Sequence, residues 1–188
     1  MTDQNQINIQ STFTEQEKRL LHDIARKAIM ASVHGDKPPE LPEVPESLKQ
    51  KAGAFVSLHR RGALRGCIGT LYPDKPLYRT VQEMAQAAAL HDPRFDPLDP
   101  DELNDLDIEI SVLTPLQPVT SIEEIEVGKH GLMIVRGHYS GLLLPQVATQ
   151  YGWDRIAFLQ HTCLKAGLPP DAWQDPESKL FIFSADVF

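Results

Sequence analysis

Apolar side chains recur at helical spacing in four segments of the chain. In the first segment one face is apolar and the charged residues lie mostly off it, as in a helix that packs on a core. Thr14 and Glu17 have the spacing of a capping box, which predicts that this helix starts at residue 14. The predicted helices span residues 14–34, 76–91, 147–151 and 153–166.

Strands are predicted between these helices, and the first of them alternates apolar and polar residues. Arg61 and Gly62 supply a turn between the first two strands, which therefore form a hairpin. Prolines in residues 36–52 predict an extended connection after the N-terminal helix. The predicted strands span residues 54–60, 64–71, 105–115, 131–136, 139–144 and 180–188, and residues 121–126 are expected to form a helical turn.

The order strand, strand, helix, loop and strand occurs twice, which predicts an internal repeat. The first half spans residues 53–115 and the second spans residues 131–188. We therefore expect residues 1–188 to form a single α+β domain. Its two related halves are expected to lie around a shared mixed or antiparallel sheet.

The alignment of the two halves indicates where their chemistry differs. Cys67 aligns with Pro145, and Glu109 aligns with Ile182 once the shorter second loop is allowed for. A repeat that serves architecture alone requires neither a thiol nor a carboxylate at these positions. Cys67 and Glu109 are therefore the candidate catalytic residues.

Composition limits the class of protein. The chain has 188 residues, 41% of them hydrophobic and 23% charged, which is typical of a globular protein without a membrane helix. The N-terminus lacks the pattern of a secretory signal, and the two cysteines are far apart, so we expect reduced thiols and a cytoplasmic location. A net charge of −8 argues against a general nucleic-acid binder.

One basic cluster opposes this overall acidity. His59, Arg60 and Arg61 lie at the tip of the predicted hairpin, and Arg65 follows in the returning strand. The cluster suits an anion or an acidic patch on a partner. The alternative interpretation is a solvated hairpin tip, because exposed arginines are common without any ligand.

Cys67 lies in this returning strand between two glycines. Strand periodicity places Arg65, Cys67 and Gly69 on one face, and a nearby guanidinium favours the nucleophilic thiolate. Gly66 and Gly69 leave room for a ligand to approach closely. The alternative is that Cys67 is a small apolar residue of the core.

The partners of this thiol are less well defined. The simplest hairpin register pairs Val56 with Cys67, which places His59 on the face away from the sulfur. A glycine bulge at Gly62 would shift the register by one residue and reverse that result. Glu109 is a candidate base, or it anchors an arginine such as Arg65 or Arg94. The alternative interpretation is that Glu109 is a polar residue on the solvent-facing side of an antiparallel sheet.

Other polar groups suggest no further chemistry. His91 is expected to cap the end of its helix, and Cys163 is expected to pack in the core. The acidic loop after the second helix has no recognised metal-ligand spacing. We therefore expect neither a metal nor a cofactor.

Five sequence blocks, taken together, resemble the AMMECR domain family, whose bacterial and archaeal members are known as AmmeMemoRadiSam system protein A. The blocks are "LRGCIGT", "AAALHDPRFDP", "DIEISVL", "GLLLPQV" and "CLKAGL", and they occur in family order. The resemblance implies two unequal subdomains and an association, by gene neighbourhood, with a Memo-like protein and a radical S-adenosylmethionine protein. It implies no defined reaction.

The family signature spans Leu64–Thr70 in this chain. The resemblance marks its residues as a functional surface, including Arg65, Gly66, Cys67, Gly69 and Thr70. One hypothesis is a Cys-centred surface, with Cys67 as a nucleophile or as the acceptor of a modification. The alternative is a non-catalytic module that binds a protein or a small anion through the arginine- and glycine-rich hairpin.

Overall fold

The computed structural model describes residues 13–41, 43–72 and 74–188, which form two compact units, each with its own four-stranded sheet. One unit comprises the described residues up to Val112 together with Asp186–Phe188, and the other comprises Leu113–Ala185. The fold is α+β, as predicted, but the single sheet expected to join the halves is replaced by two separate sheets. The polar segment before residue 13, where the sequence predicted no signal, lies outside the described residues.

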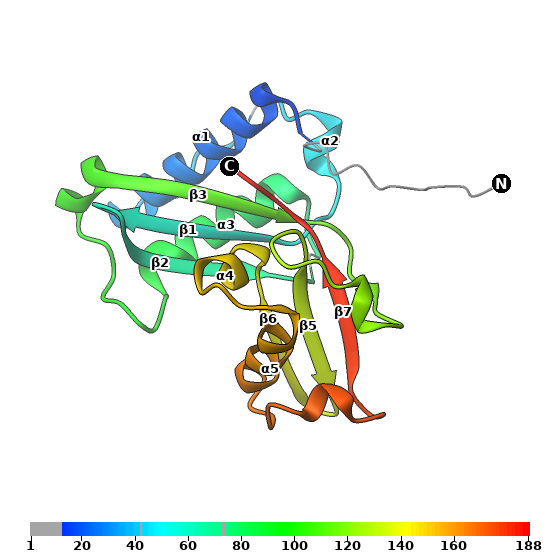
Figure 1. The fold of residues 1–188 in the computed structure, drawn as a ribbon. Helices are drawn as coiled ribbons and strands as arrows, with labels where there is room; N and C mark the ends of the chain where they lie inside the picture. The colour runs from blue at the N-terminus through cyan, green and yellow to red at the C-terminus, as the bar shows by residue number, and fades with distance from the viewer. Residues whose placement is uncertain (1–12, 42, 73) are drawn as a thin grey trace. The chain divides into compact units, whose positions relative to one another are not determined.

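The first unit combines three helices with four strands (Figure 1). Its sheet has the strand order β2-β1-β3-β8, so β2 is an edge strand. A short 3₁₀ helix, η1, precedes β3 and covers Pro100–Asp105. The other elements are α1 (Glu15–Val33), α2 (Glu46–Lys49), β1 (Ala54–Arg60), β2 (Ala63–Thr70), α3 (Leu77–Leu90), β3 (Leu106–Leu113) and β8 (Ala185–Val187).

The predicted start of α1 is confirmed by its capping box. The Thr14 side chain accepts a hydrogen bond from the backbone N–H of Glu17, whose carboxylate in turn accepts from the backbone N–H of Thr14. The connection after α1 is not extended throughout, because α2 interrupts it and buries Leu48 in the core.

The two faces of the first sheet differ sharply in polarity. Alternate residues of β1 and β3 lie in the apolar core with α1 and α3, among them Val56, Leu58 and Ile110. The opposite face carries Ser57 and His59 from β1 and the carboxylates of β3. Polar chemistry in this unit is therefore concentrated on the face of the sheet away from the two helices.

Gly66 allows α3 to approach β2 closely. A Cβ at this position would overlap the backbone carbonyl oxygen of Ala88. Gly66 is buried and its neighbour Cys67 points to the opposite face, so this glycine serves helix packing.

The second unit repeats this plan around the strand order β4-β7-β5-β6. The helix α5 packs on β5 and β6, and its Phe158 and Leu159 are fully buried. The elements are β4 (Gln117–Pro118), η2 (Ile122–Glu124), β5 (Gly131–Arg136), β6 (Tyr139–Leu143), α4 (Pro145–Gln150), α5 (Arg155–Lys165), η3 (Ala172–Gln174) and β7 (Lys179–Phe183).

The strands β2-β1-β3 and β6-β5-β7 have the same connectivity and the same antiparallel pairing. Gly141 lies against the backbone of Ala166 in α5 as Gly66 lies against Ala88 in α3. This equivalence corrects the alignment made from the sequence. The residue that corresponds to Cys67 is Leu142, not Pro145.

The same correction applies to the third strand. Ser57 pairs with Glu109, and its counterpart Met133 pairs with Phe181, so Glu109 corresponds to Phe181 and not to Ile182. A single offset of 78 residues, which pairs Cys67 with Pro145, fits the helices, where Ala88 corresponds to Ala166. The strands differ from it, since Ser57 corresponds to Met133, an offset of 76, and the additional residue of β2 reduces the offset to 75 at Cys67 and Leu142.

The predicted closing strand at residues 180–188 is two strands in different sheets. The chain leaves β7 at Ser184, where Thr114 and Ser184 exchange two hydrogen bonds, both of 2.8 Å. The following residues form β8, and Phe188 exchanges backbone hydrogen bonds with Ile110 of β3. The sequence carries no sign of this break, because residues 180–188 are mainly apolar and contain neither glycine nor proline.

Across the described ranges, none of the helices has the length and apolar character that crossing a membrane requires.

We predict that Gly66→Ala lowers the free energy of unfolding by about 1–3 kcal/mol, because the new methyl group would displace α3 from β2. Gly141→Ala is expected to have a similar effect in the second unit. Urea unfolding followed by circular dichroism measures both losses.

Gly62→Asn is the control for this series. Nothing lies within 4 Å of a Cβ at Gly62, and asparagine tolerates its positive φ of 78°. A loss below about 0.5 kcal/mol for Gly66→Ala would contradict the close approach of α3.

Candidate functional site

A bulge in β2 sets the register of the hairpin. The ladder pairs Leu58 with Gly66 and His59 with Leu64, which leaves Arg65 as the additional residue. Ser57 therefore lies opposite Cys67, and the predicted pairing of Val56 with Cys67 is wrong. The bulge is not at Gly62, which belongs to the turn and has a positive φ.

The shifted register brings three polar side chains into one row. Cys67, Ser57 and Glu109 lie on neighbouring strands, and directly opposed residues share a face of the sheet. The Ser57 hydroxyl, in a residue only 7% exposed, donates a hydrogen bond to the Cys67 sulfur across 3.2 Å. Cys67 itself is partly exposed.

His59 lies on the same face as Cys67. It is two residues along β1 from Ser57 and opposite Asp107 of β3. The simplest sequence register had placed it on the other face. The cause of that error is the bulge at Arg65, which shifts β2 by one residue relative to β1.

The loop after α3 binds the backbone of Cys67 from the open edge of the sheet. The Cys67 N–H donates to Asp92 Oδ2 at 2.8 Å, and Arg94 Nη2 donates to the Cys67 carbonyl oxygen at 3.3 Å. Because both backbone groups point away from β1, Cys67 and Ser57 form a non-hydrogen-bonded pair. Side chains lie closest in such pairs, which accounts for the contact between hydroxyl and sulfur.

Asp92 is the buried centre of this arrangement. Its side chain is 2% exposed and accepts hydrogen bonds from Arg94 Nε at 2.9 Å and Nη2 at 2.7 Å, besides that from Cys67. The hydrogen bonds from the Arg94 side chain hold the pKa of Asp92 far below its usual range, against the opposing effect of burial. The same hydrogen bonds raise the pKa of Arg94, and a negative charge on Cys67 adds to that effect.

Arg65 points to a different carboxylate. Its Nε and Nη2 donate to the two oxygens of Glu102 at 2.9 and 2.8 Å, and its Nη1 donates to the Asp96 carbonyl oxygen at 2.9 Å. Hydrogen bonds from Arg65 lower the pKa of Glu102 to about 2. Neither arginine considered as a partner of Glu109 pairs with it, since Arg65 binds Glu102 and Arg94 binds Asp92.

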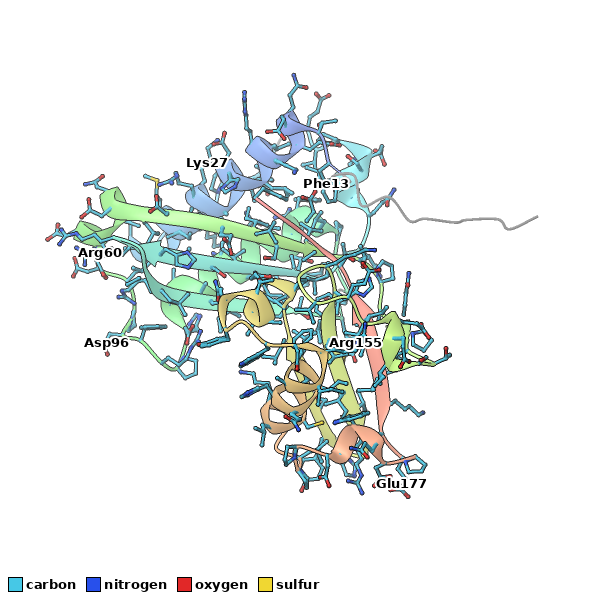
Figure 2. All side chains as sticks on the ribbon, in the orientation of Figure 1. Phe13, Lys27, Arg60, Asp96, Arg155 and Glu177 are labelled. Atoms are coloured by element: carbon cyan, nitrogen blue, oxygen red, sulfur yellow. The ribbon has the colours of Figure 1, made fainter. Side chains whose placement is uncertain are left out.

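The basic cluster at the hairpin tip is neutralised by residues of the same unit. Arg60 Nη1 also reaches Glu102, at 3.0 Å, and Arg61 pairs with Asp105 at 3.1 Å. Figure 2 shows Arg60 at the end of the sheet where this cluster lies, and Asp96 on the neighbouring loop. The positive charges at the tip are therefore compensated by carboxylates of the same unit.

The ring of Phe95 lies near the guanidinium groups of both ion pairs, Arg65–Glu102 and Arg94–Asp92. The guanidinium of Arg65 lies 5.9 Å from the centre of its ring and that of Arg94 lies 5.4 Å from it. Cation–π contacts of this kind hold both arginines against the loop.

The glycines of the signature serve packing. Gly66 faces α3, and the space beside Gly69 is filled by the ring of Phe55. The room for a ligand expected beside these two glycines is therefore absent. Thr70 turns back locally, where its hydroxyl accepts a hydrogen bond from the N–H of Tyr72 at 3.3 Å.

Two further residues and the question of a metal complete the comparison with the sequence. His91 follows α3, and its backbone N–H donates to the Ala87 carbonyl oxygen at 2.8 Å. Cys163 is fully buried, and burial raises the pKa of its thiol. Within the described ranges, no three His, Cys, Asp or Glu side chains are grouped so that they could hold a metal ion.

Sequence reasoning missed Asp92 and Ser57 as site residues. Asp92 lies in the acidic loop after the second predicted helix, and Ser57 lies in the first predicted strand, but neither was a candidate. The available signal for Asp92 was its spacing from Arg94 directly after a helix, which suits a local ion pair. The role of Ser57 depends on the bulge, for which the sequence has no comparable signal.

Comparison with known proteins agrees with this arrangement of motifs and fold. The AMMECR1 family model matches residues 22–188. The chain belongs to the AMMECR1 family.

Among the relatives, a protein of Methanothermobacter thermautotrophicus is 48% identical over 92% of this chain and 93% of its own length. A protein of Methanopyrus kandleri is 46% identical over 93% of this chain and 89% of its own length. The crystal structure of an uncharacterized protein from Pyrococcus horikoshii is similar to this AMMECR1-family structure, with a TM-score of 0.89 and 39% identity, over 93% of this chain and 92% of that one.

We predict that Glu102→Gln removes a pH-dependent part of the stability. Because folding lowers the pKa of Glu102 to about 2, its stabilisation is complete above the unfolded pKa of about 4.3 and is lost as the pH falls through 2. At neutral pH the variant is expected to lose about 3 kcal/mol, because it leaves two partly buried guanidinium groups without their carboxylate.

The difference in unfolding free energy between the variant and the parent, measured from neutral to strongly acidic pH, should narrow as the pH falls. Glu83→Gln is the matched control, since its pair with Lys75 is 41–46% exposed and should contribute little. A pH-independent difference would contradict the assignment.

Proposed function

We propose that the polar face of β1, β2 and β3 around Cys67 is the working surface of this AMMECR1-domain protein. On this surface the Cys67 thiol accepts a group from an electrophilic donor. The observation that carries the proposal is the row of Cys67, Ser57 and Glu109, which is polar in the first unit, whereas the corresponding row of Leu142, Met133 and Phe181 in the second unit is apolar.

The surroundings of Cys67 support a nucleophilic role. The Ser57 hydroxyl donates to the sulfur, and a donor of this kind stabilises a thiolate more than a thiol. The backbone N–H and carbonyl group of Cys67 are bound by Asp92 and Arg94, so the direction of its side chain is set before a donor arrives. Glu109 and His59 share this face as candidate bases.

The proposed step forms one bond and breaks one. The thiol loses its proton to a base, the sulfur electron pair forms a bond to an electrophilic carbon of the donor, and the leaving group departs with its bonding pair. The product is an S-modified Cys67. No change in oxidation state is required.

As a second part of the proposal, the protein acts as component A of a system with a Memo-like protein and a radical S-adenosylmethionine protein. This part is supported by the AMMECR signature motifs, from Leu64 to Thr70. One of these partners would supply the donor of the group, or receive it from Cys67.

The alternative function, anion binding by the hairpin, has less support. Arg60, Arg61 and Arg65 all have carboxylate partners in their own unit. Their charges are therefore largely compensated. A protein that docks on the hairpin remains an outcome of the co-expression experiment below.

We predict that iodoacetamide alkylates Cys67 of the folded protein faster than it alkylates a free cysteine. Ser57→Ala should lower this rate about fivefold, because it removes a hydrogen bond to the sulfur of about 1 kcal/mol. Tryptic peptides separate the two thiols, since Cys67 lies in Gly66–Arg79 and Cys163 lies in Ile156–Lys165.

Cys163 is the internal control in every sample. Because it is fully buried, its modification would reveal unfolding and not reactivity. A Cys67 that reacts more slowly than a free cysteine from about pH 6 to pH 9 would refute the nucleophilic role.

We also predict a mass increase on the peptide Gly66–Arg79 when the protein is co-expressed with the Memo-like and radical proteins. Intact-mass and peptide mass spectrometry measure it. Cys67→Ser should abolish the increase, whereas Cys163→Ser should retain it. An unmodified peptide together with a co-purifying partner would favour the binding module.

A further inference from the structure

Arg94 differs from Arg65, the other arginine beside the strand of Cys67, in having a donor that no described residue of the unit accepts. All three nitrogens of the Arg65 guanidinium bind oxygens of the same unit. Arg94 uses Nε and Nη2 for Asp92 and the Cys67 carbonyl group, and no residue in the described ranges accepts a hydrogen bond from its Nη1. Its side chain is 54% exposed, whereas that of Arg65 is 17% exposed.

The Nη1 group of Arg94, which has no acceptor in the described ranges, is held in a fixed direction. The buried carboxylate of Asp92 accepts two parallel hydrogen bonds from the Arg94 guanidinium. The centre of the Phe95 ring lies 5.4 Å from the central carbon of that guanidinium. The hydrogen bond from Nη2 to the carbonyl oxygen keeps the guanidinium beside Cys67. An arginine that is already oriented loses less conformational entropy when it binds a ligand.

From this geometry we infer that Arg94 binds an oxyanion, a carboxylate or a phosphate, on the donor that modifies Cys67. This inference rests on the proposed function and narrows the substrate class to anionic electrophiles. Arginine suits such groups because its planar donors match the oxygens of a carboxylate or a phosphate. The anionic group stays with Arg94 while the electrophilic carbon reaches the sulfur.

The anion therefore binds at the loop after α3 and not at the hairpin tip. The Arg61 side chain is 78% exposed, more than that of Arg94, but it pairs with Asp105. It makes no hydrogen bond to Cys67, whose backbone is bound by Asp92 and Arg94. Arg61 therefore offers a matched control, since it is an exposed, carboxylate-paired arginine without contact to the cysteine.

A pair of alkylating reagents with different charge tests this inference. Iodoacetate and iodoacetamide react with a thiol in the same way, but only iodoacetate carries a carboxylate. The measured quantity is the ratio of their rates at Cys67, divided by the same ratio for the unfolded chain in urea. We expect this normalised ratio to be about three to ten in the parent protein, which corresponds to one screened charge pair.

Arg94→Gln should return the ratio to about one, whereas Arg94→Lys should retain part of the preference, because it keeps the charge without the planar fork. Arg61→Gln should leave the ratio unchanged. Added salt should reduce the preference of the parent protein, since it screens exposed charges.

The outcomes separate the two proposals. If both reagents modify Cys67 quickly but Arg94→Gln leaves the ratio unchanged, the anion site is refuted and the reactive thiol stands. If Arg94→Gln slows both reagents equally, Arg94 acts only through the backbone of Cys67, which also refutes the anion site. If neither reagent reacts faster than with a free cysteine, the nucleophilic role is refuted, and the anion site falls with it.

Discussion

The buried carboxylate of Asp92 is the interaction on which the candidate site depends. An edge strand leaves alternate N–H and carbonyl groups unpaired, and at Cys67 these groups are bound by Asp92 and Arg94 in place of another strand. Asp92 remains ionised because Arg94 compensates the cost of its burial. Without Asp92 and Arg94, the N–H and carbonyl group of Cys67 would lose their hydrogen bonds to the loop. The position of Cys67 opposite Ser57 would then be less firmly fixed.

The comparison of the two units shows what the scaffold requires and what it does not. Both place a glycine where a helix crosses the second strand, so the close approach at Gly66 and Gly141 belongs to the architecture. The polar row and the bulge occur in the first unit. In the second unit, the β5–β6 ladder has no register shift. A bulge disrupts a ladder, and Arg65, the additional residue, is held by Glu102. The departure from regular pairing is therefore stabilised by a specific ion pair.

The sequence predicted local elements well because local rules determine them. The capping box fixed the start of α1, and the Arg61-Gly62 turn fixed the hairpin between β1 and β2. It did not predict the bulge at Arg65, which depends on a carboxylate 37 residues away in the chain. For the same reason it misjudged the face of His59 and the partner of Cys67. The division into two sheets was also missed, because apolar residues continue from β7 into β8 without a glycine or proline between them.

The hydrogen bonds from Asp92 and Arg94 to the backbone of Cys67 also limit how a partner can reach the thiol. Strand addition needs free backbone donors and acceptors along an edge, and at Cys67 both are occupied by side chains of the loop. A partner that reaches Cys67 must therefore approach the polar face of the sheet and not pair with β2 at this residue. On that face the sulfur is flanked by the hydroxyl of Ser57 and, one strand further, by Glu109. Chemistry at side chains, and not exchange of backbone hydrogen bonds, is the mode of recognition that this arrangement leaves open.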